Sequence, residues 1–172
     1  SCVLWYTVCM SESLEVILLG GVALTLGGRP LAALRSQKAI ALLVYLACTQ
    51  RAHSREMLAD MLWDATSTAQ SLSNLRTVLA RLRRHLGDYL LVTPETIALA
   101  QDAPVALDVR TLEEQIAALP RHLSPAAALQ MEQALASYQG DFLAGFHLDG
   151  ATGFDDWALV ERERLRFSVD VT

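Results

Sequence analysis

The sequence has few cysteines, no long uncharged hydrophobic run and no clustered histidines, and each shortage excludes a class of protein. Three cysteines among 172 residues, none in a Cys-x-x-Cys pair, do not make a disulfide framework, so a reducing cytoplasm is the simpler location. No apolar stretch reaches the ~18 residues of a transmembrane span, so we expect no membrane partner. The four histidines are scattered along the chain, so we expect no zinc site and no cofactor.

Catalytic motifs are also missing from the sequence. It contains no P-loop, no Gly-x-Gly-x-x-Gly, no nucleophile elbow and no His-Glu-x-x-His. The acidic residues at 155–156 and at 161 and 163 are typical of a helix start and of a solvated helix face. We therefore do not expect an enzyme.

The charges that are present are unevenly distributed. The whole chain has a net charge of −5, with 52% apolar and 19% charged residues, which is an ordinary globular composition. Residues 14–100 contain nine Lys or Arg against six Asp or Glu, whereas residues 101–172 contain five against twelve. This asymmetry predicts two modules with different partners, and only the first can readily approach a polyanion.

The expected elements divide the chain into three parts. Residues 1–13 begin with an uncharged stretch before Met10 that lacks the basic region of a signal peptide, and we interpret them as a cloning remnant or an upstream extension. Residues 14–101 are expected to form one domain. Residues 102–172 are expected to form a second, helical domain.

The first domain is expected to begin with strands and continue with helices. Residues 22–26 alternate with a period of two and precede a glycine pair, which predicts a small antiparallel sheet with a tight turn. Two helices are expected next, at about 37–48 and 54–64. Ser36 stands where its side chain can cap the first helix. The second is expected to start at Ser54, with Glu56 in its first turn, where the helix dipole favours a carboxylate.

The segment 67–86 is the most informative helix candidate. Ser67-x-x-Gln70 fits a capping box, and Gly87 stands where a helix would end. Five leucines recur at spacings of three and four and share one face: Leu72, Leu75, Leu79, Leu82 and Leu86. The opposite face carries amide, hydroxyl and guanidinium groups, from Gln70, Ser73, Asn74, Thr77, Arg81 and Arg84, with Arg76 and Arg83 on one flank.

Two short β-like runs, at 89–92 and 96–99, follow this helix and predict a hairpin that turns at Thr93-Pro94-Glu95. A sheet, three helices and a hairpin follow one another in the order of a winged helix. The polar face of the third helix suits the DNA major groove, because Arg pairs with phosphates or guanine and Asn or Gln pairs with adenine. The alternative is a merely solvated arginine face, and the cap, the leucine stripe and the hairpin together favour DNA binding over it.

The second domain is expected to contain three helices. The first runs from Asp108 or Thr111 to about residue 120, and another runs from 125 to 140 after a Ser-Pro start. The last spans about 154–171. Its expected apolar side consists of Trp157, Val160, Leu165 and Phe167.

Several blocks of this sequence, taken in order, resemble one known family. The blocks in the first half are LEVILLGGVALTLGGRPL, LRSQKAIALLVYLA, SREMLADMLW and SNLRTVLARLRRHLGDYLL. The blocks in the second half are ALDVRTLEEQI, ALASYQGDFLAGF and FDDWALVERERLR. Over about residues 14–166 the chain resembles the antibiotic regulatory protein (SARP) transcription factors, which have an OmpR/PhoB-type winged helix followed by a bacterial transcriptional activator domain (BTAD).

The resemblance implies a fold and a function. The implied fold is α+β, mainly α, with a winged helix (N-terminal β-sheet, three-helix core, β-hairpin wing) followed by a TPR-like helical domain. The implied function is a sequence-specific transcriptional activator that binds direct repeats of double-stranded DNA, contacts RNA polymerase and self-associates on adjacent sites. The activator domain of the family is longer than residues 102–172, so we interpret the chain as a fragment of a larger regulator.

The expected site residues lie on the third helix and at the starts of the first two helices, where free amides favour an anion. Those expected nearest the bases are Gln70, Ser73, Asn74, Thr77 and Arg81. Those expected at phosphates are Arg35, Lys38, Ser54, Arg55, Arg76 and Arg84. The competing function is a protein-interaction module whose winged helix no longer binds DNA. The modest positive charge of the first half and the hairpin turn without a cation favour that alternative.

Overall fold

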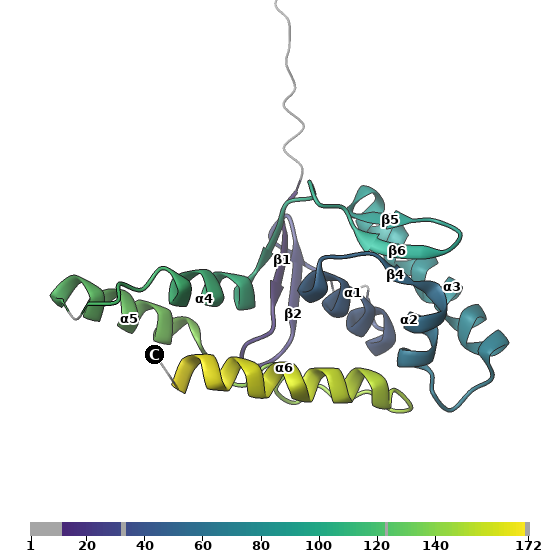
Figure 1. Ribbon diagram of the computed structural model, residues 1–172. Coiled ribbons are helices and arrows are strands. Elements are labelled where there is room, and N and C mark those ends of the chain that lie inside the picture. Colours follow the sequence, from purple (N-terminus) through teal and green to yellow (C-terminus); the bar gives the residue numbers. More distant parts are fainter. Residues whose placement is uncertain (1–11, 32–33, 123, 171–172) are drawn as a thin grey trace, which may run out of the picture.

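The computed structural model describes residues 12–31, 34–122 and 124–170, and its fold is mixed α/β and mainly helical (Figure 1). The expectation of a mainly helical chain with small β-sheets is confirmed. The α-helices of the described part are α1 (Gln37–Thr49), α2 (Arg55–Leu62), α3 (Thr68–Leu86), α4 (Asp108–Ala117), α5 (Pro125–Ser137) and α6 (Thr152–Asp170). The segment 1–13 lies almost wholly outside the described residues, so its interpretation stays a prediction.

The N-terminal sheet has four strands, and its last strand comes from far along the chain. Its strands, in spatial order, are β3 (Arg29–Pro30), β2 (Ala23–Leu26), β1 (Leu14–Ile17) and β7 (Val105–Leu107). The antiparallel β1–β2 pair confirms the alternation seen in the sequence. The parallel β1–β7 pair was not predicted, because three residues are too few to show a period.

A second, smaller sheet follows α3. It consists of β4 (His53–Ser54), β6 (Thr96–Leu99) and β5 (Leu90–Val92), in that spatial order. The antiparallel β5–β6 pair is the predicted hairpin. The short β4 pairs with β6 directly before α2 begins, so the hairpin is attached to the start of that helix.

Serine side chains cap four of the helices, and the sequence predicts three of these caps, at Ser36, Ser67 and Ser124. Ser36, Ser54, Ser67 and Ser124 each accept a hydrogen bond from the backbone amide three residues further on. The capping box of α3 is only half formed. The Gln70 side chain donates to Asn74 Oδ1 at 2.9 Å, one turn ahead in the helix.

Both halves of the chain contribute to one hydrophobic core. Leu14 of β1, Leu42 of α1, Leu82 of α3 and Phe154 of α6 are all buried in the same cluster. In Figure 1, α6 runs below β2 and α1, while α4 and α5 project away from the sheet. The division into domains at 101/102 and the TPR-like character of the second half stay predictions.

The buried face of α6 differs from the expected one. Phe154, Ala158 and Leu165 are buried, whereas Val160 is 65% exposed and Phe167 is 70% exposed, so placing these two on the apolar side was wrong. Trp157 is half-buried and packs its ring edge-on against the rings of Tyr45 at 4.9 Å and Phe142 at 5.7 Å. No helix in the described part is both long and apolar enough to cross a membrane.

Candidate nucleic-acid interface

The helix α3 separates an apolar face from a polar face, and the polar face is open. Leu75, Val78, Leu79, Leu82 and Leu86 are buried against the core. Leu72, at the edge of the stripe, is only partly buried. Among the α3 side chains expected to contact bases or phosphates, Asn74 is half-buried. The others are exposed: Gln70, Ser73, Arg76, Thr77, Arg81 and Arg84. At about 100° per residue, most of these project from one side of the helix.

Two local hydrogen bonds organise the first half of this face. Gln70 Nε2 donates to Asn74 Oδ1 at 2.9 Å, and Thr77 Oγ1 donates to the Ser73 carbonyl at 3.3 Å. The Gln70–Asn74 bond leaves the Asn74 amide nitrogen free to donate. The arginines of the second half have no carboxylate partner among the described residues, so they are available to an external anion.

Arg55 and Arg76 lie together beside the hairpin. They line a hollow of about 360 Å³ with Ser54, Leu72, Pro94 and Glu95. Arg55 Nε is buried and has no hydrogen-bond partner among the described atoms. Glu56 and Glu95 line the same hollow, so its two arginines face two carboxylates. A phosphate placed there would meet both signs of charge.

Two backbone amides at the start of α2 already donate hydrogen bonds within the chain. Ser54 Oγ accepts from the Met57 amide at 3.1 Å, and the Arg55 amide donates to the Glu95 carbonyl at 2.9 Å. Fewer free amides therefore remain for an anion than the sequence led us to expect. The hydroxyl of Ser54 serves the helix, and its contact with a phosphate stays a prediction.

The turn of the hairpin is held by hydrogen bonds between its own residues. Thr93 Oγ1 accepts from the amides of Glu95 at 3.2 Å and Thr96 at 2.8 Å. Pro94 and Glu95 are exposed at the tip. The tip therefore presents a carboxylate and no cation, as the sequence indicated.

Lys38 and Arg35, which flank the start of α1, have different environments. Lys38 Nζ donates to the carbonyls of Leu62 at 2.5 Å and Asp149 at 2.6 Å and lies 5.7 Å from the centre of the Trp63 ring. Burial lowers the pKa of Lys38, although Asp64, Asp149 and Asp155 act in the opposite direction. Arg35 is exposed. The structure thus favours an internal role for Lys38, whereas Arg35 remains open to a phosphate.

Sequence reasoning missed the residues that join α2, α3 and α6. Asp64 accepts hydrogen bonds from the amide and hydroxyl of Thr152 at the start of α6, and these bonds lower the pKa of the Asp64 carboxyl. Ser71 Oγ, which is buried, donates to the carbonyls of Trp63 and Ser67. An isolated Asp after a helix and a Ser among leucines carried no signal of these long-range contacts.

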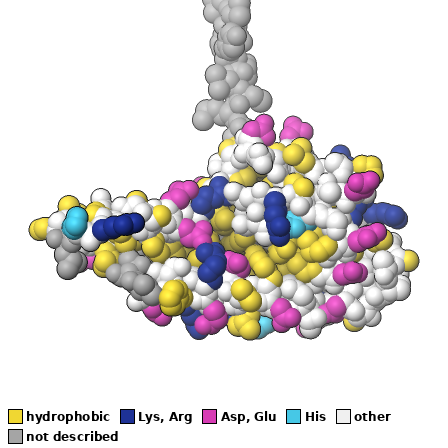
Figure 2. All heavy atoms as spheres, viewed as in Figure 1, with side chains coloured by type: hydrophobic (Ala, Val, Ile, Leu, Met, Phe, Trp, Pro, Cys, Tyr) yellow, Lys and Arg dark blue, Asp and Glu magenta, His cyan; other side chains and the backbone are white. Residues whose placement is uncertain are grey.

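The charges on the visible face of the molecule are mixed. Figure 2 shows basic and acidic side chains interleaved, with hydrophobic side chains gathered over α1 in the middle. Among the described residues, no group of three or more His, Cys, Asp or Glu could hold a metal ion. Four exposed arginines, at positions 76, 81, 83 and 84, follow one another along α3.

Comparison with solved structures finds chains of similar fold. No family model matches the chain, and no curated protein matches it. The structure of Mycobacterium tuberculosis EmbR in complex with a low affinity phosphopeptide matches 91% of this chain with a TM-score of 0.67 and 21% sequence identity. The match covers 44% of the EmbR chain, so this chain spans less than half of its length. The chain shares the fold of part of EmbR.

Proposed function

We propose that the chain is the DNA-binding part of a sequence-specific transcriptional activator. The observation that carries the proposal is the outer face of α3, where exposed amide, hydroxyl and guanidinium groups lie opposite a buried leucine stripe. The residues from Gln70 to Arg84 cover ~21 Å of helix, which is enough to lie along a major groove. In this proposal α1–α3 and the β5–β6 hairpin form a winged helix, and α3 is its recognition helix.

The proposed contacts of the chain with DNA are of two kinds, with base edges and with phosphates. Gln70, Ser73, Asn74, Thr77 and Arg81 are proposed to face the base edges. Arg76 and Arg84 are proposed to contact phosphates, together with Arg35, Ser54 and Arg55 at the starts of the first two helices. Lys38 is left out of this set because carbonyl oxygens already surround its ammonium group.

The helices α4–α6 are proposed to form the beginning of a BTAD-like activator region. Residues 101–172 carry a net charge of −7, which makes them poor neighbours of phosphates. They are proposed to contact RNA polymerase or a second copy of the chain bound to an adjacent direct repeat. The sequence blocks shared with the SARP family support this part of the proposal.

The test is selection of preferred duplexes from a random DNA pool, followed by affinity measurements with the whole chain. We expect enrichment of a short motif, and loss of binding when Arg81 and Arg84 are both replaced by glutamate. Arg121→Glu is the control, matched in charge to Arg84→Glu alone, because Arg121 is exposed in the acidic half. Failure to enrich any sequence, or equal losses in the control, would overturn the proposal.

A protein-interaction module is the second candidate, and one observation favours it. Leu159, Val160 and Phe167 on α6 are 53%, 65% and 70% exposed, which is unusual for large apolar side chains on one helix. A chain that binds no duplex but loses a partner when Val160 and Phe167 are replaced by serine would establish this function instead.

A further inference from the structure

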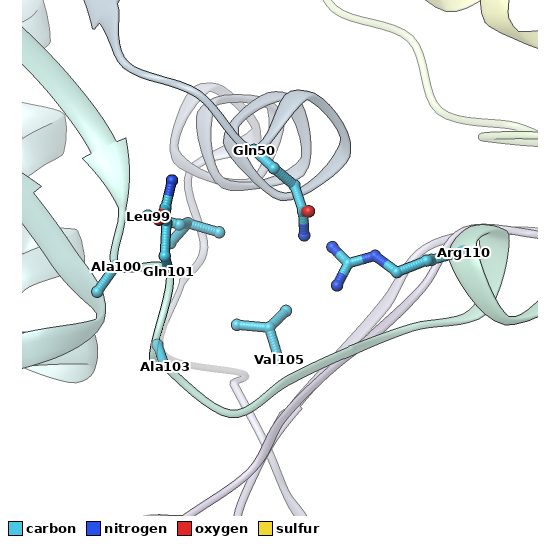
Figure 3. A pocket seen from close by; sticks show the side chains of 7 residues that line it. All are labelled: Gln50, Leu99, Ala100, Gln101, Ala103, Val105 and Arg110. Atoms are coloured by element: carbon cyan, nitrogen blue, oxygen red, sulfur yellow. The ribbon is translucent and has the colours of Figure 1, made fainter.

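A cavity lies where the hairpin, the end of α1 and the start of α4 meet, away from the proposed DNA-binding face. Its volume is about 240 Å³, and it is lined by Gln50, Leu99, Ala100, Gln101, Ala103, Val105 and Arg110 (Figure 3). Three separate segments thus form its walls: the end of α1, the β6–β7 connection with β7 itself, and the first turn of α4. The proposed function uses none of these residues.

Arg110 brings an unpaired positive charge to this cavity. Figure 3 shows its guanidinium group pointing into the open space from α4. Arg110 Nη2 is buried and has no hydrogen-bond partner among the described atoms, and no carboxylate of the described residues forms a salt bridge with Arg110. A buried donor without an acceptor is costly, and a guanidinium group is best satisfied by the two oxygens of one planar anion.

Gln50 supplies a second polar group to the same space. Its side chain points toward the Arg110 guanidinium in Figure 3. Gln50 ends α1 in the left-handed conformation, with φ of 51°, where glycine is the usual residue. Glycine would satisfy the backbone there, but only a side chain such as glutamine places a carboxamide at the cavity.

The remaining walls are partly apolar. Leu99 and Ala100 are buried, and Ala103 and Val105 are half-buried beside them. The Ala100 and Ala103 amides are already bonded to the carbonyls of Tyr89 and Ala100, so they offer no further donors. A cavity of this size with a cation at one side and methyl groups at the other fits a small molecule with one charged end and a short apolar tail.

We propose that this cavity is a binding site for a small organic carboxylate, which Arg110 and Gln50 hold by its carboxylate group while Leu99, Ala103 and Val105 contact its tail. The bound molecule joins the end of α1 to the first turn of α4. It therefore links the part of the chain that carries α3 to the helices of the acidic half. Binding at this site is independent of whether the chain binds DNA.

The test uses butyrate as the probe and follows the backbone amide signals of the whole chain by two-dimensional NMR. Butyrate is expected to shift the signals of Gln50, Gln101 and Arg110 in a saturable way. Butyramide, which has the same shape but no charge, is expected to bind at least about tenfold more weakly, because a hydrogen bond to a charged group is stronger than one to a neutral group. Inorganic phosphate, which has the charge but no tail, is also expected to bind more weakly.

Two variants and a control locate the site. Arg110→Gln is expected to weaken butyrate binding at least about tenfold. Ala103→Leu keeps the charge but fills the cavity, and is expected to weaken binding to a similar extent. Arg121→Gln, an exposed arginine of the same half, is expected to bind butyrate like the original chain. Circular dichroism checks that each variant is folded, and the butyramide comparison on the unaltered chain needs no variant.

Several results would overturn the proposal. The first is the absence of a saturable shift at about 50 mM butyrate, a concentration at which a ligand with a millimolar dissociation constant fills most sites. The second is equal affinity for butyramide and butyrate. The third is butyrate affinity in Arg110→Gln equal to that of the original chain. Phosphate that binds as tightly as butyrate would show a simple anion site and would also refute the organic carboxylate.

Discussion

At the scale of single residues, Lys38 and Arg35 are two nearby cations whose structural environments differ. Both flank the Ser36 cap of α1, and both are cations that a phosphate could attract. Lys38 Nζ is held by carbonyl oxygens at the end of α2 and before α6, whereas Arg35 is exposed. Both carry one positive charge within two residues of Ser36. Only the packing of distant segments shows that their environments differ.

Replacing each of these cations by methionine should give opposite results. Lys38→Met is expected to lower the free energy of unfolding by about 1–3 kcal/mol, because three carbonyl oxygens lose a charged donor. Arg35→Met is expected to leave stability almost unchanged but to reduce the slope of log K against log salt by about 0.9. Urea unfolding and DNA binding at several salt concentrations measure the two effects. A reduced salt slope in Lys38→Met at unchanged stability would contradict the internal role.

Asn74 is the residue that tests base recognition. Asn74→Ala should reduce affinity for the preferred duplex by about 1–3 kcal/mol and relax the choice of base at one position. Fluorescence anisotropy with preferred and random duplexes measures both quantities. Arg84→Gln is the comparison, since loss of a phosphate contact should weaken binding to both duplexes alike. If Asn74→Ala also weakens both equally, Asn74 does not read a base.

His53 should make the stability of the chain depend on pH. It is buried, its Nε2 atom lies 2.7 Å from Thr49 Oγ1, and its ring packs against Tyr45. Burial, and then the charge of Arg51, lower its pKa from the ordinary value of 6.5. As the pH falls, His53 therefore takes up a proton in the unfolded chain before it does so in the folded chain. The free energy of unfolding keeps its full His53 contribution above a pH of about 6.5 and decreases as the pH falls below that value.

The pH dependence is measured by urea unfolding at about pH 7.5 and about pH 5.5. His53→Gln should remove most of the loss between these two conditions. His147→Gln is the control, because His147 is exposed. Equal losses in the original chain and in His53→Gln would show that another group is responsible.

At the scale of elements, α6 is held to α1 by aromatic rings. Trp157 packs against Tyr45, Phe142 and Phe154 at centroid distances of 4.9, 5.7 and 5.4 Å. We expect Trp157→Ala to lower the free energy of unfolding by about 3 kcal/mol, at the low end for a tryptophan because this one is only half-buried. Phe167→Ala, on the exposed side of the same helix, should change it by less than about 0.5 kcal/mol.

Both values come from chemical unfolding of the two variants. A large loss in Phe167→Ala would mean that the exposed side of α6 is covered in solution, for instance by a second copy of the chain. A loss that depends on protein concentration would identify that second copy.

The elements that the sequence predicted well are those with long, local patterns. The leucine stripe and Ser67 cap defined α3 to within one residue, and serine caps located the starts of α1 and α5. The elements it missed, β4 and β7, have two and three residues and exist only through pairing with distant strands. Val160 and Phe167 of α6 were misplaced because an apolar residue type alone does not show which side of a helix meets the rest of the chain, and that side here carries Phe154, Ala158 and Leu165.

The candidate site was predictable to the same extent. Exposure of the polar side of α3 follows from burial of its leucines, so the face could be found from spacing alone. The occupied donors at the start of α2 and the carbonyl oxygens around Lys38 could not be found this way, since the groups that occupy them come from the hairpin and from residues before α6.

At the scale of the whole molecule, the two halves share a core that crosses the expected boundary. Asp108 accepts from the amides of Leu18 and Leu19 at 2.9–3.0 Å, and β7 completes the sheet beside β1. We therefore expect a chain that ends at residue 104 to lose cooperative unfolding, while the whole chain shows one transition. Urea unfolding followed by tryptophan fluorescence and by circular dichroism measures this. A sharp, stable transition in the shortened chain would show that residues 14–101 fold alone.

The pairing of β1 with β7 also has a consequence for synthesis. Leu14 leaves the ribosome well before its parallel neighbour Val105, which follows only after α1, α2, α3 and the hairpin. Contacts between residues this far apart in sequence form late, because a long loop must close first. During translation the open edge of β1 is therefore exposed while α1–α3 are already present, and it closes only when the residues through Asp108 have emerged.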